Sequence, residues 1–174
     1  MSANREVIKE VQSLIIKEKY DRALKLLEDM TRNDSENALY PNYIGIIHFM
    51  KEDYKNAANF FKKAIELDPS NWYPYKKLGE ICALKNIDAC AIKYFTETIE
   101  RDPKNIYSLL NLALIFHKEE EELAMELIQS ALSMDPSNLV GNYLLGSIYL
   151  NKKEYKRAEE YFTGVVSKDP RNSV

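Results

Sequence analysis

The chain has 174 residues, a formal net charge of −3 and a hydrophobic content of 45%. Acidic and basic residues are interspersed, which argues against a nucleic-acid-binding surface, and no stretch of about 18 apolar residues predicts a membrane span. The first residues lead into an amphipathic pattern rather than the apolar core of a signal peptide, so we expect no secretory leader.

Two residue types recur along the chain at an almost constant spacing. Gly45 and Gly79 are 34 residues apart, and Gly146 follows after a further 67. The recurring prolines are spaced by 34, 33 and 34 residues, at Pro69, Pro103, Pro136 and Pro170. Both series contain the same one-residue shortening, so the sequence predicts tandem repeats of about 34 residues.

Each repeat predicts two helices, because its apolar residues follow two patterns of helical period. The proline ends the second helix, since it lacks a backbone N–H and cannot continue the winding. A small residue in each helix predicts a close approach of the two helix axes. The five repeats span residues 4–37, 38–71, 72–105, 106–138 and 139–172.

In chain order, the first repeat ends in a polar segment at residues 31–37, and the second begins with Pro41 in its first turn. Side chains that accept hydrogen bonds predict helix N-caps at Asp34, Asp53, Ser70 and Asp88. The fourth repeat lacks one residue, which the spacing places in the turn at residues 117–122. We expect the helix pair of that repeat to change the pitch of the stack.

The repeat resembles the tetratricopeptide family, which places alanine at position 20, an aromatic residue at 24 and proline at 32. Position 20 holds Ala23, Ala57, Ala91, Ala124 and Ala158, and position 24 holds Leu27, Phe61, Phe95, Ile128 and Phe162. The chain departs from the family in having no Trp at position 4, and Val11 and Ser35 replace the glycine and proline of the first repeat. The resemblance implies an all-α fold, a right-handed α-solenoid superhelix of five helix-turn-helix repeats, formed by residues 4–172 as a single array.

Cys82 and Cys90 are the two cysteines, and their spacing matches neither CxxC nor a zinc site. We expect both to be buried free thiols, which favours a reducing compartment, cytoplasmic or alternatively nuclear.

The sequence contains no motif that predicts catalysis. Its two histidines, His48 and His117, lack partners at metal-ligand spacing, and no Gly-rich phosphate loop or GxSxG elbow occurs. We expect a satisfied interior imidazole at His48. The chain is therefore expected to be non-catalytic, with no cofactor and no metal.

The resemblance implies that the first helix of each repeat lines a concave groove, at positions 2, 5, 9, 12 and 13. The candidate partner-binding residues are Leu39, Asn42, Ile46, Phe49, Tyr73, Lys76, Glu80, Tyr107, Leu110, Leu114, Tyr143 and Ser147. Tyrosine is typical of recognition surfaces because it combines a large contact area with a polar tip. Alternatively, the aliphatic residues at these positions pack between helices, especially Ile15, Leu84 and Leu150.

A clamp for the C-terminal carboxylate of heat-shock chaperones, known from this family, is disfavoured. Lys76 and Asn111 match its pattern, but Glu80, Val140 and Leu144 do not. We expect Glu80 to repel a carboxylate in the groove.

The last helix carries apolar residues that the family pattern leaves partly uncovered, which indicates an interface at Tyr161, Phe162, Val165 and Val166. The leading hypothesis is a scaffold that binds an apolar helical or extended segment of a partner protein in the groove. The alternatives are self-association as a homo-oligomer through the last repeat, or a regulatory module of a longer complex or enzyme.

Overall fold

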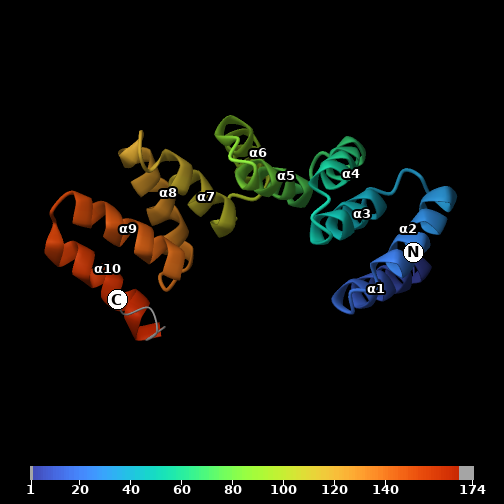
Figure 1. The fold of residues 1–174 in the computed structure, drawn as a ribbon, viewed down its shortest axis with the longest axis horizontal. Helices are drawn as coiled ribbons and strands as arrows, with labels where there is room; N and C mark the ends of the chain where they lie inside the picture. The colour runs from blue at the N-terminus through green and yellow to red at the C-terminus, as the bar shows by residue number, and fades with distance from the viewer. Residues whose placement is uncertain (1, 169–174) are drawn as a thin grey trace. The chain divides into compact units, whose positions relative to one another are not determined.

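The computed structural model describes the backbone of residues 2–168 and the side chains of residues 5–163. Within that range the chain forms ten α-helices and no strand (Figure 1). The all-α architecture of successive helical hairpins predicted by the repeat is thus confirmed.

The chain divides into two compact units, Met1–Ile81 and Cys82–Val174, and the boundary lies within α5 (Trp72–Leu84). The first unit, called unit 1, contains α1 (Ser2–Ile16), α2 (Tyr20–Asn33), α3 (Leu39–Met50) and α4 (Tyr54–Leu67). The second, called unit 2, contains α6 (Asp88–Arg101), α7 (Ile106–Phe116), α8 (Glu121–Met134), α9 (Leu139–Asn151) and α10 (Tyr155–Lys168). Odd-numbered helices are the first helices of the predicted repeats, and even-numbered helices are the second.

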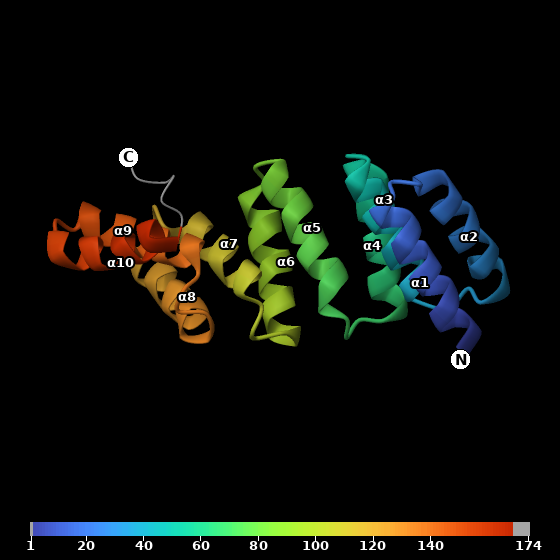
Figure 2. The same ribbon diagram turned by 90° about the horizontal axis from the view of Figure 1, so that it is seen from below.

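In unit 1, α3 and α4 form a closely packed hairpin (Figure 2). Their axes approach at Gly45, where an added Cβ would lie 2.8 Å from the ring of Phe61. Ala57 and Phe61 are both fully buried. The glycine therefore has the role predicted for a small residue, which is to leave room for the aromatic side chain of the second helix.

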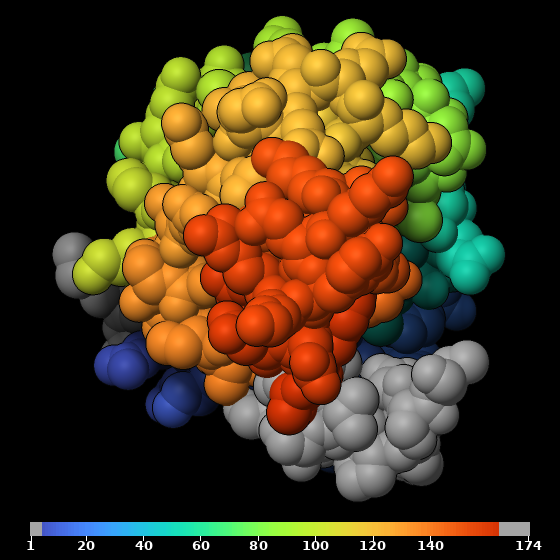
Figure 3. All heavy atoms as spheres, turned by 90° about the vertical axis from the view of Figure 1, so that its left-hand side faces the viewer, coloured from blue at the N-terminus to red at the C-terminus, as the bar shows by residue number. Residues whose placement is uncertain are grey.

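Unit 2 repeats this arrangement between α9 and α10, which lie against each other in Figure 3. A Cβ on Gly146 would lie 2.7 Å from Phe162. Across both units the alanines at position 20 are buried, at Ala23, Ala57, Ala91, Ala124 and Ala158. These contacts are local to each hairpin, which is why the repeat pattern alone could predict them.

Four of the five hairpins turn in the same way. The second residue of each turn has a positive φ, namely Glu18 at 55°, Glu52 at 59°, Asn86 at 54° and Lys153 at 60°. The next backbone N–H donates to a carbonyl five residues back, as Asp53 does to His48 at 2.9 Å. This is the Schellman ending of a helix, in which a left-handed residue reverses the chain.

The fourth repeat turns differently, because it lacks the left-handed residue. Its backbone N–H groups at Glu119 and Glu120 both donate to the carbonyl of Phe116, at 3.1 and 2.8 Å. The missing residue therefore falls in the turn where the spacing placed it, while the change in pitch remains a prediction.

The structure corrects three of the four predicted N-caps. Asp53 does cap α4, since its Oδ1 accepts the N–H of Asn56 at 3.2 Å. Asp34 instead ends α2, Asp88 is already the first residue of α6, and Ser70 precedes α5 by more than one residue. Two further caps are asparagines that the sequence pattern did not predict: Asn105 accepts from Ser108 and Asn138 accepts from Gly141.

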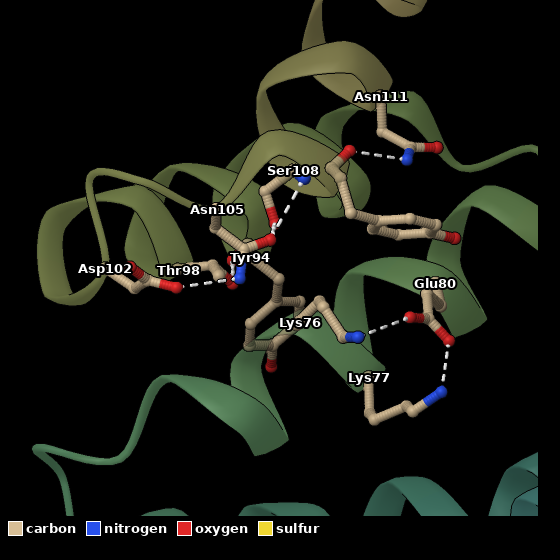
Figure 4. Close-up of polar contacts among 10 residues, drawn as sticks. Lys76, Lys77, Glu80, Tyr94, Thr98, Asp102, Asn105, Ser108 and Asn111 are labelled. Carbon is tan, nitrogen blue, oxygen red and sulfur yellow. Dashed lines mark hydrogen bonds and ion pairs between the residues drawn. The ribbon is translucent and has the colours of Figure 1, made fainter. Parts of the chain in front are cut away.

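These asparagines belong to an Asp-x-x-Asn pattern, in which the recurring proline directly follows the aspartate. The Asn105 side-chain amide donates to Asp102 at 3.0 Å, and Asn138 donates to Asp135 at 3.4 Å (Figure 4 shows the first pair). In each pair the aspartate follows the last residue of one helix and the asparagine caps the next helix. The hydrogen bond between them therefore joins the two ends of the turn.

The structure joins Cys82 and Cys90 by a disulfide bond, with Cα atoms 5.6 Å apart. The prediction of two free thiols is therefore wrong. The physical reason is that the helical hairpin brings the last turn of α5 against the first turn of α6, within the separation that a disulfide spans. With that correction the cysteines no longer favour a reducing compartment. None of the helices that the structure describes has the length and apolar character that crossing a bilayer requires.

Candidate partner-binding surface

In unit 2 the first helices expose a row of large apolar side chains. On α7, Tyr107 and Leu114 are two helical turns apart and therefore lie on one face. On α9, Val140, Tyr143 and Leu150 share a face for the same reason. These five side chains are between 47% and 58% exposed. We call this set the α7–α9 surface.

Polar residues within the two stripes satisfy their hydrogen bonds inside their own helices. Asn111 donates its side-chain amide to the carbonyl of Tyr107 at 2.8 Å, as drawn in Figure 4. Ser147 donates its hydroxyl to the carbonyl of Tyr143 at 2.8 Å. These two hydrogen bonds lie within the helices, so a ligand that covers them does not have to replace them.

The rings of Tyr107 and Tyr143 each contact a phenylalanine ring on a second helix. The rings of Tyr107 and Phe95 are 6.2 Å apart, and those of Tyr143 and Phe162 are 6.1 Å apart. Such tilted ring contacts fix the orientation of each tyrosine and leave a large part of it exposed.

Three candidate residues, Leu110, Asn42 and Glu80, are buried and do not belong to an exposed surface. Leu110 is only 6% exposed and lies in the core of unit 2, 3.5 Å from the position of a Cβ on Gly141. Asn42 is 7% exposed. By contrast Leu84 and Leu150, which could have packed between helices, are exposed, while Ile15 packs partly against the unit 1 core.

In unit 1 the corresponding face of α3 is less exposed. Leu39 is exposed, whereas Ile46 and Phe49 are half-buried. Together with Asn42 they follow one another at helical spacing and form a single stripe along α3.

Next to this stripe, α5 carries a cluster of charged side chains at one- and three-residue spacing. Glu80 Oε2 lies 2.7 Å from Lys77 Nζ, and Glu80 Oε1 lies 3.6 Å from Lys76 Nζ (Figure 4). The three side chains are only 10% to 18% exposed. Two ammonium groups therefore surround the Glu80 carboxylate, and the expected repulsion of a carboxylate by Glu80 took no account of them.

Aromatic rings enclose the same cluster. Lys77 Nζ lies 4.4 Å from the ring centre of Phe49, and Lys76 Nζ lies 5.2 Å from that of Tyr73 and 5.7 Å from that of Trp72. Burial raises the pKa of Tyr73 to about 12, with smaller contributions from the charge of Glu80 and from Tyr43. The Tyr73 hydroxyl therefore remains protonated at neutral pH and keeps its capacity to donate a hydrogen bond.

The histidines occupy structural positions. His48 Nδ1 lies 3.0 Å from Asp53 Oδ2, and the ring stacks on Phe60 with centres 5.4 Å apart. His117 is half-buried in the turn after α7, and its Nδ1 has no hydrogen-bond partner among the described residues. No group of three His, Cys, Asp or Glu side chains in the described part of the chain is arranged to hold a metal ion.

Of the candidate C-terminal interface, Tyr161 and Phe162 are half-buried against α9. Tyr161 stacks on Tyr149, with ring centres 5.6 Å apart, and Phe162 lies at Gly146. Val165 and Val166 lie outside the described side chains. Self-association through this helix therefore stays a prediction.

Comparison with known proteins agrees with the helical pattern. Two segments, residues 42–71 and 141–172, match the tetratricopeptide repeat. No curated protein sequence matches the chain.

Solved structures share the fold at low sequence identity. MamA from Desulfovibrio magneticus RS-1 is 20% identical, with 98% of this chain and 97% of that chain covered at a TM-score of 0.78. YrrB, described as a TPR protein with an unusual peptide-binding site, is 20% identical, with 95% and 86% covered at a TM-score of 0.75. PilF from Pseudomonas aeruginosa is 15% identical, with 95% and 76% covered at a TM-score of 0.83. The chain thus carries segments that match the tetratricopeptide repeat at residues 42–71 and 141–172, in a helical fold that it shares with these solved structures.

Proposed function

We propose that the chain is a non-catalytic scaffold that binds an apolar helical or extended segment of a partner polypeptide on the faces of its first helices. The observation that carries this proposal is the α7–α9 surface, in which five large apolar side chains remain about half exposed. Scattered exposed apolar residues are ordinary, but a contiguous set on adjacent helices marks an interaction site.

Packing within the repeats does not account for these residues. Leu109, Ala113 and Leu145 already fill the core of unit 2 from the opposite faces of α7 and α9. About half of each of the five side chains of the α7–α9 surface is nevertheless exposed, and covering that half with a ligand removes apolar area from water. YrrB, which shares the fold, is described as having a peptide-binding site, and this supports the same kind of ligand here.

The proposal is tested with a library of random 12-residue peptides carrying amidated C-termini, selected for binding to the full chain. We expect enriched peptides to contain apolar residues at helical or alternating spacing. The double substitution Tyr107→Ala/Tyr143→Ala should weaken their binding by about ten-fold or more, because tyrosines in apolar surfaces often dominate binding.

Tyr155→Ala is the matched control, since Tyr155 is also exposed but lies on α10, a second helix. It should leave peptide affinity unchanged. Failure to enrich any peptide, or equal losses in the double variant and in the control, would overturn the proposal.

A further inference from the structure

We propose that the α7–α9 surface binds an amphipathic helix of a partner polypeptide, and that the bound face of this helix carries no charged side chain. The inference rests on the proposed function and deepens it. It decides between a helical and an extended ligand, and it specifies the charge of the face that is bound.

The two helices that carry the surface contain no charged residue. α7 and α9 are 11 and 13 residues long, and neither includes an Asp, Glu, Lys or Arg, in a chain of which 29% of the residues are charged. The next charged residues along the chain are Lys118 after α7 and Lys152 after α9, and Lys152 Nζ lies 2.9 Å from Glu121 Oε1. A charged group of a ligand that covers α7 and α9 would lose hydration without gaining a partner of opposite sign on either helix.

The surface also offers little to the backbone of an extended ligand. Asn111 and Ser147 are the polar side chains between the exposed apolar residues, and each donates to a carbonyl of its own helix, at Tyr107 and Tyr143. An extended segment has a backbone N–H and a C=O to satisfy at every residue except proline. Each of these groups that the surface covers and leaves unpaired weakens binding.

A helical ligand avoids this loss, because its backbone N–H and C=O groups are paired within the helix. Such a ligand contacts the surface through side chains alone, at positions such as i, i+3, i+4 and i+7.

The spacing of the exposed side chains fits a helix of a few turns. Tyr107 and Leu114 are seven residues apart on α7, and Tyr143 and Leu150 are seven residues apart on α9. At the rise of an α-helix, each pair spans about 10 Å along its axis. Two turns of a ligand helix have the same length, so apolar residues at i and i+7 of the ligand match both pairs.

The test uses a library of random 18-residue peptides that are acetylated and amidated, because isolated helices of about 12 residues are marginal in water. Peptides selected by the full chain should repeat apolar residues at helical spacing and carry charged residues only on the opposite face. Apolar residues at alternating spacing would overturn the helical ligand and leave the scaffold function intact. If neither this library nor the 12-residue library yields a binder, the scaffold function itself fails.

A covalent cross-link between positions i and i+4, on the charged face of a selected peptide, tests its bound conformation. The side chains at these positions are about 6 Å apart in a helix and about 13 Å apart in an extended strand. The cross-link should strengthen binding by about ten-fold, because it orders the helix before binding. The control peptide contains the same two residues without the link. Equal or weaker binding of the cross-linked peptide would overturn the helical ligand.

The charge of the bound face is tested by placing Glu or Gln at each apolar position of a selected peptide in turn. The native chain should bind the Glu peptides about ten-fold more weakly than the Gln peptides, because the surface gives a carboxylate no partner. Equal affinities would overturn the requirement for an uncharged face.

The variant Leu114→Lys should reverse this preference at one or more positions, because it adds an ammonium group to the surface. Leu114 is 57% exposed, so a lysine there does not have to be buried. Leu150→Lys makes the same change on α9 and keeps the test available if the first variant does not fold. Tyr155→Lys on α10 is the matched control and should retain the preference for Gln. A preference for Gln at every position in both folded surface variants would overturn the assignment to α7 and α9.

Two measurements on the full chain address other occupants of an apolar surface. Sedimentation at several concentrations that shows self-association abolished by Leu114→Lys would assign the surface to a second copy of the chain. Binding to phosphatidylcholine vesicles that is abolished by the same substitution would assign it to a lipid surface. Either result would overturn the partner helix, and we expect neither. Circular dichroism at increasing temperature shows whether each variant keeps the helical fold.

Discussion

Gly45 and Phe61 are in closer contact than any residue with a Cβ would permit in place of Gly45. A Cβ on Gly45 would lie 2.8 Å from two atoms of the Phe61 ring, and that ring is fully buried. This pair sets the distance between α4 and α3, the helix that carries four of the candidate partner-binding residues.

The substitution Gly45→Ala should therefore destabilise the protein, although alanine favours helix more than glycine. Overpacking of a core costs roughly 1–3 kcal/mol, and the gain in helix propensity offsets about 1 kcal/mol of it. Urea denaturation should show a lower free energy of unfolding by about 1 kcal/mol. Adding Phe61→Leu to the same chain should recover part of the loss, and a variant as stable as the native chain would contradict the close contact.

Replacing Glu52 by glycine should stabilise the protein. Glu52 has a φ of 59°, and a left-handed conformation costs a residue with a Cβ about 1 kcal/mol relative to glycine. The melting temperature should rise accordingly. Lys51→Gly is the control, because Lys51 precedes it in the same turn with a φ of −85°, where glycine brings no relief. Equal effects of the two substitutions would show that the turn does not depend on the left-handed residue.

The disulfide should contribute to the stability of the helical hairpin that contains it. A cross-link that closes a loop of this size stabilises a protein by about 2–3 kcal/mol in the chain-entropy model, and its residues Cys82 and Cys90 are eight positions apart. A reductant should lower the midpoint of urea denaturation of the native chain. In Cys82→Ala/Cys90→Ala the reductant should have no effect. Labelling of both thiols in the unfolded, unreduced chain would show that the bond is absent.

Asp53 should make the protein sensitive to acid. The hydrogen bonds from Asn56 hold the pKa of Asp53 below its ordinary value, and the contact with His48 adds a smaller effect in the same direction. Because the folded state lowers this pKa, the stabilisation is complete above the ordinary aspartate pKa and is lost as the pH falls through the lower, folded value. Thermal denaturation over a range of acidic pH values measures this loss.

The variant Asp53→Asn separates the charge from the cap, since asparagine caps a helix about as well but does not titrate. It should retain most of the stability at neutral pH and lose less on acidification than the native chain. An identical pH profile for both proteins would place the acid sensitivity elsewhere.

The repeat period predicted the helical hairpins and their close contacts, because these depend on residues less than one repeat apart. Position 20 must be small wherever two helices of a hairpin meet, so Ala57 and Ala158 are both buried at the same place in their repeats. The Asp-x-x-Asn turns were equally local, and the pair formed by Asp102 and Asn105 could have been recognised from its recurrence.

The exposure of the candidate surface did not follow from position within the repeat. Leu110 and Tyr143 both stand at position 5, yet the first is buried and the second is 58% exposed. The difference depends on contacts between repeats: Gly141 allows α9 to approach Leu110 closely. A sequence position specifies the face of a helix but not which neighbouring helix covers it.

The sequence by itself determined the ten helices, their pairing into hairpins and the small residues at their crossings, because each of these depends on short-range periodicity and sterics. Only the tertiary structure decided that the cysteines are joined and that five apolar side chains remain exposed on α7 and α9. These properties depend on which side chains the packing of separate helices brings within a few ångströms, and spacing along the chain does not record that.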